Sequence, residues 1–221
     1  MQTIQSYDQT FRKSNPNCIV IWHSVCILLT VDINTLERGA GRDGPEAMHE
    51  GRQALARWAQ TPSARRSCLH AAQTFRTLSH RKPADGTAFQ SVRALFMSAL
   101  VLGLYILMGP TYERTGESGV FDLADTEVNW IEVGDEGVSN SGLPDPSHPL
   151  IQNEVENPAV YFIRHGGPIL FSGKIYHPGA RHAQRMILDF AELLDEVGTH
   201  WMADYPRLLY MVNDTMGNPR T

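Results

Sequence analysis

The stretch from residue 40 to residue 76, AGRDGPEAMHEGRQALARWAQTPSARRSCLHAAQTFR, most constrains what this chain can fold into. A glycine-rich turn opens it, and Pro45 stands where a proline favours the first turn of a helix. Thr61 and Pro62 repeat this start signal, because a threonine side chain can cap the helix that a proline begins. Two helices separated by such a break predict stacked helices. No catalytic arrangement of residues accompanies them.

Two uncharged segments lie on either side of this stretch. Residues 14–31 and 94–112 contain no Asp, Glu, Lys or Arg, and each approaches the ~20 residues that a membrane span needs. Polar residues and a proline shorten the apolar part of the first segment, and the second loses its apolar character after Met108. We interpret both as helices buried on most sides, with a membrane span as the alternative. The first helix is expected from about Cys18 into the thirties, although its β-branched residues also allow a strand.

The helix after Pro62 is expected to divide into an inward and an outward side. The inward side would hold Cys68, Leu69, Ala71, Ala72 and Phe75, and the outward side Arg65, Arg66, Gln73 and Arg76. With Arg81 and Lys82, the arginines could form a basic stripe for nucleic acid. A solvated helix face explains the spacing equally well, and the net charge of the chain is −5. The charge is uneven: residues 1–93 carry 12 Lys and Arg against 7 Asp and Glu, whereas residues 94–221 carry 7 against 17.

The sequence therefore predicts an all-α fold, an irregular multi-helix array with a long acidic loop before the C-terminal helix. The expected parts are an N-terminal extension (1–17), a helical core (18–108), an acidic loop rich in Gly, Pro and Ser with a short helix (109–158), a C-terminal helical segment (159–203) and a tail (204–221). Within the loop, Val128, Trp130 and Ile131 alternate with acidic residues. That pattern fits an activation segment, but we favour a short helix that docks on the core. In the C-terminal segment an apolar stripe predicts a helix ending near Gly198, with Met186, Ile187, Phe190, Leu193, Leu194 and Val197 on its buried face.

Gly39, Gly41 and Gly44 match the spacing of a dinucleotide-binding loop, GxGxxG. That loop needs a preceding strand and an acidic residue about 20 positions later, which holds the ribose. No Asp or Glu occurs between Glu50 and Asp85, and the residues before the turn look helical. We therefore interpret these glycines as a tight turn between helices.

His23 and Cys26 have a spacing that could ligate zinc from one helix face, but a structural zinc site needs four ligands and no partner pair exists. A core histidine beside a buried thiol is the favoured interpretation. His165, His177 and His182 gather near the C-terminus without a carboxylate at metal-site spacing. The three cysteines, Cys18, Cys26 and Cys68, look like small buried apolar residues in a reducing compartment. The sequence also lacks a GxSxG nucleophile elbow and a P-loop, so no catalytic, cofactor-binding or metal-binding residue is predicted.

Three segments carry a resemblance to a known family: IWHSVCILLTVDINTLERGAGRDGPE, ALARWAQTPSARRSCLHAAQTF and ALFMSALVLGLYIL. Together they resemble the fungal-specific transcription factor domain, or middle homology region, as found in regulators with N-terminal Cys2His2 zinc fingers. The signposts are Trp22-His23, the turn at 41–44, Trp58 before Thr61-Pro62, and His70-Ala71. The match covers most of residues 18–201, and residues 18–108 carry nearly all its specificity.

This resemblance implies a non-enzymatic domain in the nucleus that regulates RNA polymerase II transcription. Its partners would be proteins of the transcription machinery or a second copy, or it would respond to a small effector, and no membrane is expected. Zinc and DNA binding would belong to the finger module of full-length relatives, since three cysteines build no such module here. The family's earlier helices are also missing, so we expect a truncated domain whose first and fourth helices expose apolar faces. The alternative is an enzymatic or small-molecule-binding helical protein that uses the Cys26/His23 pair or the C-terminal histidines.

Overall fold

A computed structural model describes residues 15–110, 120–138, 157–198 and 204–217. Helices dominate these residues, and strands are few and short. The elements are α2 (Pro16–Leu28), α3 (Ile33–Gly39), α4 (Pro45–Trp58), α5 (Pro62–Ser79), the 3₁₀ helix η1 (Pro83–Asp85), α6 (Phe89–Met108), β1 (Phe121–Asp122), α7 (Trp130–Val133), α8 (Pro158–His165), β2 (Ile169–Phe171), β3 (Lys174–Tyr176), α9 (Ala180–Val197) and α10 (Asp204–Gly217). The predicted multi-helix, mostly α architecture is confirmed.

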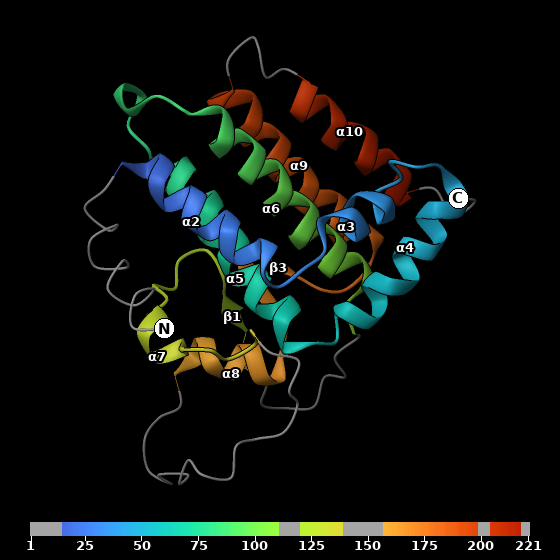
Figure 1. Cartoon of the computed structure of the whole chain (residues 1–221), viewed down its shortest axis with the longest axis horizontal. Coiled ribbons are helices and arrows are strands. Elements are labelled where there is room, and N and C mark those ends of the chain that lie inside the picture. Colours follow the sequence, from blue (N-terminus) through green and yellow to red (C-terminus); the bar gives the residue numbers. More distant parts are fainter. Residues whose placement is uncertain (1–14, 111–119, 139–156, 199–203, 218–221) are drawn as a thin grey trace, which may run out of the picture.

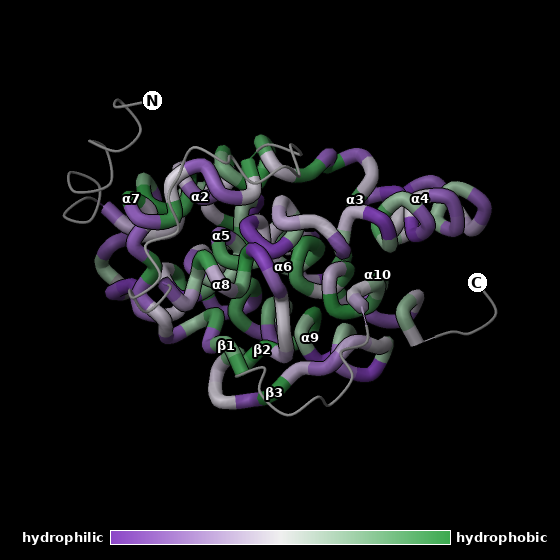
Figure 2. The backbone as a smooth tube through the Cα atoms, turned by 90° about the horizontal axis from the view of Figure 1, so that it is seen from below, coloured by the Kyte–Doolittle hydropathy of each residue, from purple (hydrophilic) through white to green (hydrophobic). Residues whose placement is uncertain are grey.

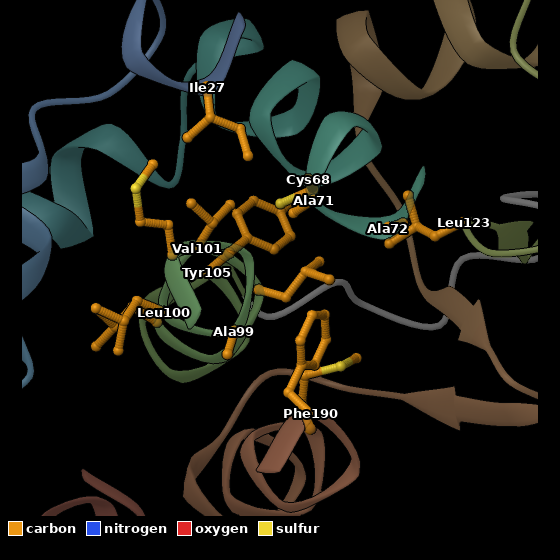
Figure 3. Close-up of a cluster of buried hydrophobic side chains, with 14 of the residues drawn as sticks. Ile27, Cys68, Ala71, Ala72, Ala99, Leu100, Val101, Tyr105, Leu123 and Phe190 are labelled. Carbon is orange, nitrogen blue, oxygen red and sulfur yellow. The ribbon is translucent and has the colours of Figure 1, made fainter. Parts of the chain in front are cut away.

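Helix α6 is the axis of the molecule. It contacts α2, α3, α4, α5, α9 and α10, and Figure 1 shows it between the α2/α5 pair and the α9/α10 pair. In Figure 3 the Tyr105 ring of α6 lies beside Cys68 and Ala71 of α5, and the Phe190 ring rises from α9 toward the same core. Hydrophobic residues gather among these central helices in Figure 2, whereas α4 is largely hydrophilic. A helix that is apolar on all sides is stable in water only when other helices cover it, as they do here.

Among the described helices, α6 is the one that is long and apolar enough to cross a bilayer by itself. In the structure, 78% of its most apolar window of 18 residues is buried inside the protein. The pair α2 and α3 passes the same test only as one bent unit, with an angle of 85° between the two helices. The neighbouring helices therefore cover most of the apolar surface of α6.

The helix start signals act as predicted. The Thr61 hydroxyl accepts a hydrogen bond from the Ala64 amide, and Pro62 begins α5. Pro45 begins α4 directly after Gly44, whose φ of 91° favours glycine. The prediction of one helix from Cys18 into the thirties is wrong, however. Asp32 caps a new helix through the amides of Asn34 and Thr35, so the chain turns sharply between α2 and α3.

The all-α prediction omits a small sheet in the order β1-β2-β3. β1 pairs parallel with β2, in the register Phe121 to Ile169, and β2 forms a hairpin with β3. Ser172 and Gly173 both have positive φ, 47° and 72°, as a tight hairpin turn requires. Ring contacts of Phe171 with Phe75 and Phe190 fasten this sheet to the helical core.

The segment 204–221 was predicted to be a tail, and the structure corrects this. Residues 204–217 form α10, which packs along α9 through Leu209, Val212 and Met216. Between residues 109 and 158, the expected docking helix is confirmed as α7, where Trp130 and Val133 are buried. Much of the predicted acidic loop and residues 1–14 of the predicted N-terminal extension lie outside the described residues.

Candidate protein-interaction surface

Helix α2 presents a row of apolar side chains to solvent. Ile21 is 40% exposed, Val25 47%, Leu28 49% and Leu29 65%. The spacing of 4, 3 and 1 residues places these four side chains on one side of the helix, which we call the α2 outer face. Single exposed apolar residues are ordinary on protein surfaces, whereas contiguous exposed apolar patches are common at interaction sites.

The sequence of α2 explains why this row is exceptional. The opposite side of the helix buries Val20, His23 and Ile27 against α5 and α6, so α2 is apolar on both sides. No charged residue occurs anywhere in the helix. A helix of this kind is normally covered all round, yet within the described parts of the chain nothing covers the outer face of α2. The expectation of an uncovered first helix therefore holds for the described residues. The same expectation for the fourth helix, α6, is wrong, because other helices cover α6 along nearly its whole length.

A hollow of about 590 Å³ continues the outer face beyond the C-terminal end of α2. Its lining consists of Leu28, Leu29, Thr30, Val31, Asp32, Ile33 and Trp58. The Trp58 indole is fixed there, since its Nε1 donates a hydrogen bond to the Thr30 carbonyl over 3.2 Å. The α2–α3 bend thus places a shallow depression, widely open to solvent, at the end of an apolar helix face.

The inner side of α2 is anchored by a buried cluster of aromatic side chains. His23 of α2 and His70 of α5 approach to 3.0 Å between their Nδ1 atoms, and Trp130 of α7 stacks on His70 at 3.8 Å with an angle of 5°. Trp22 contacts all three of these rings edge-on. We call these four side chains the His–Trp cluster. It holds α2, α5 and α7 together and so fixes the orientation of the outer face.

Both imidazoles of the cluster are neutral at physiological pH. Burial lowers the pKa of His23 to about 3, and it lowers the pKa of His70 well below its ordinary value, with smaller contributions from His23 and Arg66. One Nδ1 must donate and the other accept. The Nε2 of His70 is buried without a hydrogen-bond partner. Because an unpartnered lone pair is less costly than an unpartnered N–H, we infer that His70 donates through Nδ1.

The His23/Cys26 pair considered for zinc gains no further ligand among the described residues. His23 faces His70 instead of Cys26, and no group of three or more metal-ligating side chains occurs among the residues that the structure describes. Burial raises the pKa of Cys26 to about 11, and burial also raises that of Cys68 well above its ordinary value, so neither thiol is activated. The prediction that all three cysteines are buried is confirmed for Cys68, whereas Cys26 is only partly buried and Cys18 is exposed on α2.

The predicted glycine turn is confirmed as a connection between helices. Gly39 ends α3, and Gly41 and Gly44 have positive φ values of 103° and 91° before α4 begins. The element that precedes this turn is a helix and not the strand that a dinucleotide site requires.

Arg65 and Arg66 form neither the basic stripe nor the solvated helix face that their spacing allowed. Arg65, Arg66 and Gln73, which were expected to face outward, are 6%, 8% and 9% exposed. Arg65 donates hydrogen bonds to the carbonyls of Gln60, Ile163 and Arg164, and Arg66 donates to those of Gly134 and Glu136. These guanidinium groups tie α5 to α8 and to the residues after α7, so they have a structural role and are not available to nucleic acid.

The three C-terminal histidines separate into two places. His177 and His182 lie edge to face with 5.5 Å between their ring centroids, whereas His165 contacts Tyr161 on α8. Sequence reasoning missed His70 and Trp130 as the partners of His23. No sequence signal indicates them, because they lie 47 and 107 residues from His23 along the chain. No known family model, curated protein or solved structure matches this chain.

Proposed function

We propose that this chain is a non-enzymatic regulatory domain that acts on RNA polymerase II transcription in the nucleus through protein contacts made by the α2 outer face. The transcriptional part of the proposal comes from the sequence resemblance to the fungal transcription factor domain. The contact surface comes from the structure. In this account zinc and DNA binding belong to the finger module of full-length relatives.

The single observation that carries the proposal is the uncharged, apolar outer face of a helix whose inner face is already buried. Ile21, Val25, Leu28 and Leu29 expose 40–65% of their surface. Burying apolar surface is worth ~25 cal/mol per Å², so four such side chains supply a large share of the energy of a small interface. A helix that only closed the core would carry polar residues at these positions.

The chemistry of the face indicates its partner. A row of apolar side chains at helical spacing fits the apolar stripe of another helix, as in helix-in-groove recognition. The hollow beside Trp58 is large enough for a bulky apolar side chain of that helix, which would act as an anchor. We therefore propose an apolar or amphipathic helix of another polypeptide as the occupant.

Tethering the chain to a heterologous DNA-binding domain tests this proposal. The fusion is expected to change the transcription of a reporter gene in fungal cells. The double variant Val25→Glu/Leu29→Glu should lose that effect, because two carboxylates would be desolvated in the interface. Gln53→Glu/Gln60→Glu is the matched control, since it adds the same charge at exposed positions of α4 and at its end.

Three outcomes of the reporter experiment would count against this proposal. A reporter that the wild-type fusion does not change at equal protein level contradicts the transcriptional part of the proposal. A reporter effect that survives in Val25→Glu/Leu29→Glu contradicts the assignment of the α2 outer face. Loss of the effect in the Gln53→Glu/Gln60→Glu control as well would mean that added charge alone explains the result.

A further inference from the structure

A pocket of about 630 Å³ opens between the start of α9 and the end of α10, and the α2 surface does not include it. Its lining consists of Arg181, His182, Gln184, Arg185, Leu188 and Asn213. The amide of Gln184 donates to the backbone carbonyl of Asn213 over 3.1 Å, so the two helices that form the walls are joined. A concave site with several converging polar groups is the usual form of a small-molecule site.

The charges in this pocket are of one sign. Arg181 and Arg185 are four residues apart and so lie on the same side of α9. Neither guanidinium makes an ion pair or hydrogen bond with another residue that the structure describes, and no carboxylate is among the described residues that line the pocket. The acid one turn further along, Asp189, is held by Lys174 at 2.8 Å and by the Tyr176 hydroxyl at 2.6 Å. Among the described residues of the lining, nothing therefore offsets the charge of the two arginines.

The backbone adds to this positive field. α9 has 18 residues, and Gly179 at its N-cap offers no side chain to the amides of the first turn. Free amides and the helix dipole together favour an anion at such an end. Arg181 and His182 both belong to this first turn, and both line the pocket.

Two side chains of the lining carry polar atoms without partners. Nδ1 of His182 and Oδ1 of Asn213 are shielded from solvent and make no hydrogen bond among the described residues. Rotation of the Asn213 amide by 180° would place its NH₂ group at the same position as a donor. Burial lowers the pKa of His182, and His177, Arg185 and Arg181 lower it further. A bound anion would relieve this crowding of like charge.

We propose that this pocket binds a small ligand bearing phosphate groups, held by Arg181 and Arg185 and by the first-turn amides of α9. One arginine guanidinium can donate two parallel hydrogen bonds to the oxygens of a phosphate group. The two arginines here are one helical turn apart, so both can contact one ligand. The pocket shares no lining residue with the hollow at α2, so a regulatory ligand and a partner helix can bind at the same time.

Thermal unfolding of the purified chain in inorganic pyrophosphate, at constant ionic strength, tests the proposal. At about ten times the dissociation constant, the wild-type midpoint should rise by roughly 3–6 °C. The variant Arg181→Gln/Arg185→Gln should lose this rise. Arg93→Gln/Arg207→Gln should keep it, because it removes two exposed arginines on α6 and α10 that do not line the pocket.

A second measurement locates the ligand independently of stability. Pyrophosphate should raise the pKa of His182, followed by NMR, in the wild type and leave it unchanged in Arg181→Gln/Arg185→Gln. An absent midpoint shift in the wild type, or an equal shift in all three proteins, overturns the proposal. Binding of duplex DNA that requires Arg181 and Arg185 but is not displaced by pyrophosphate would also overturn the proposal, in favour of a nucleic-acid contact. None of these outcomes depends on the α2 outer face.

Discussion

His23 and His70 share one hydrogen bond at a site where burial holds both imidazoles neutral. In the unfolded chain both have an ordinary pKa near 6.5. Below that pH the unfolded chain binds protons that the folded protein does not bind. The free energy of unfolding therefore has its full value above about pH 6.5 and decreases as the pH falls toward about 3. We expect each histidine to cost about 2 kcal/mol of stability at pH 5 relative to pH 7.

Urea unfolding at several pH values checks this loss. The variant His70→Phe retains a ring to stack on Trp130 but removes one titrating group, so its stability should fall less steeply, by about one proton, between pH 6 and pH 5. His49→Gln, at an exposed position of α4, should leave the slope unchanged. An identical slope in the wild type and His70→Phe would contradict a neutral, buried pair.

Arg65 makes a second prediction at the residue scale. Its guanidinium donates to the carbonyl of Ile163 at 2.6 Å, of Arg164 at 2.9 Å and of Gln60 at 3.0 Å. Arg65→Ala should cost roughly 2–4 kcal/mol, because it leaves buried carbonyls without donors. Arg65→Lys keeps the charge but not the planar fork, and should recover less than half of that loss. Chemical unfolding of the two variants measures this, and a cost below about 0.5 kcal/mol for Arg65→Ala would contradict the assigned role.

The contacts of individual side chains are the part of the structure that the sequence predicts least well. His23 and Cys26 lie three residues apart in the chain, but the residue that His23 contacts is His70, on another helix. Arginine is usually exposed, so periodicity assigned Arg65 and Arg66 to the outside. Their burial depends on hydrogen bonds to backbone carbonyls such as those of Ile163 and Gly134, which lie near helix ends far along the chain. No local sequence pattern indicates these acceptors.

At the scale of elements, α3 and α4 pack through two glycines. A Cβ atom on Gly51 would lie 2.6 Å from the backbone nitrogen of Gly39, a distance that no side chain can occupy. Gly51→Ala should therefore destabilise the protein by roughly 1–3 kcal/mol, although alanine is the better helix former. Gln53→Ala, at an exposed position of the same helix, should be neutral or slightly stabilising. Thermal unfolding that places Gly51→Ala at or above the wild type would show that the helices are not in this close contact.

Start signals and long apolar stripes made the main helices predictable. Thr61-Pro62 and Pro45 mark the starts of α5 and α4, and the stripe from Met186 to Val197 marks α9. The break before Asp32 was missed because neither glycine nor proline marks it, and the cap is a single aspartate. The strands β1 to β3 have two or three residues each, too few for alternation to show, and pairing with distant residues defines them.

At the scale of the whole molecule, the described helices form a buried core around α6 and leave the α2 outer face exposed. α6 is surrounded by other helices, and ring contacts bring the sheet onto the same core. The α2 outer face lies outside this core and still carries apolar residues. The sequence resemblance led us to expect an uncovered first helix, but it did not predict which side of the helix is open. That side depends on how the His–Trp cluster turns α2.

The central claim, that another polypeptide covers the α2 outer face, is tested most directly by the reactivity of a cysteine placed on it. In a Cys18→Ser background, Val25→Cys should react rapidly with a maleimide in the purified chain, and Gln53→Cys on α4 should react at a similar rate. The native Cys26 and Cys68 should react slowly, because burial raises their pKa. In cells of the organism that encodes the chain, the account predicts that Val25→Cys is protected at least tenfold relative to Gln53→Cys. Equal reactivity of the two positions in those cells would contradict the claim.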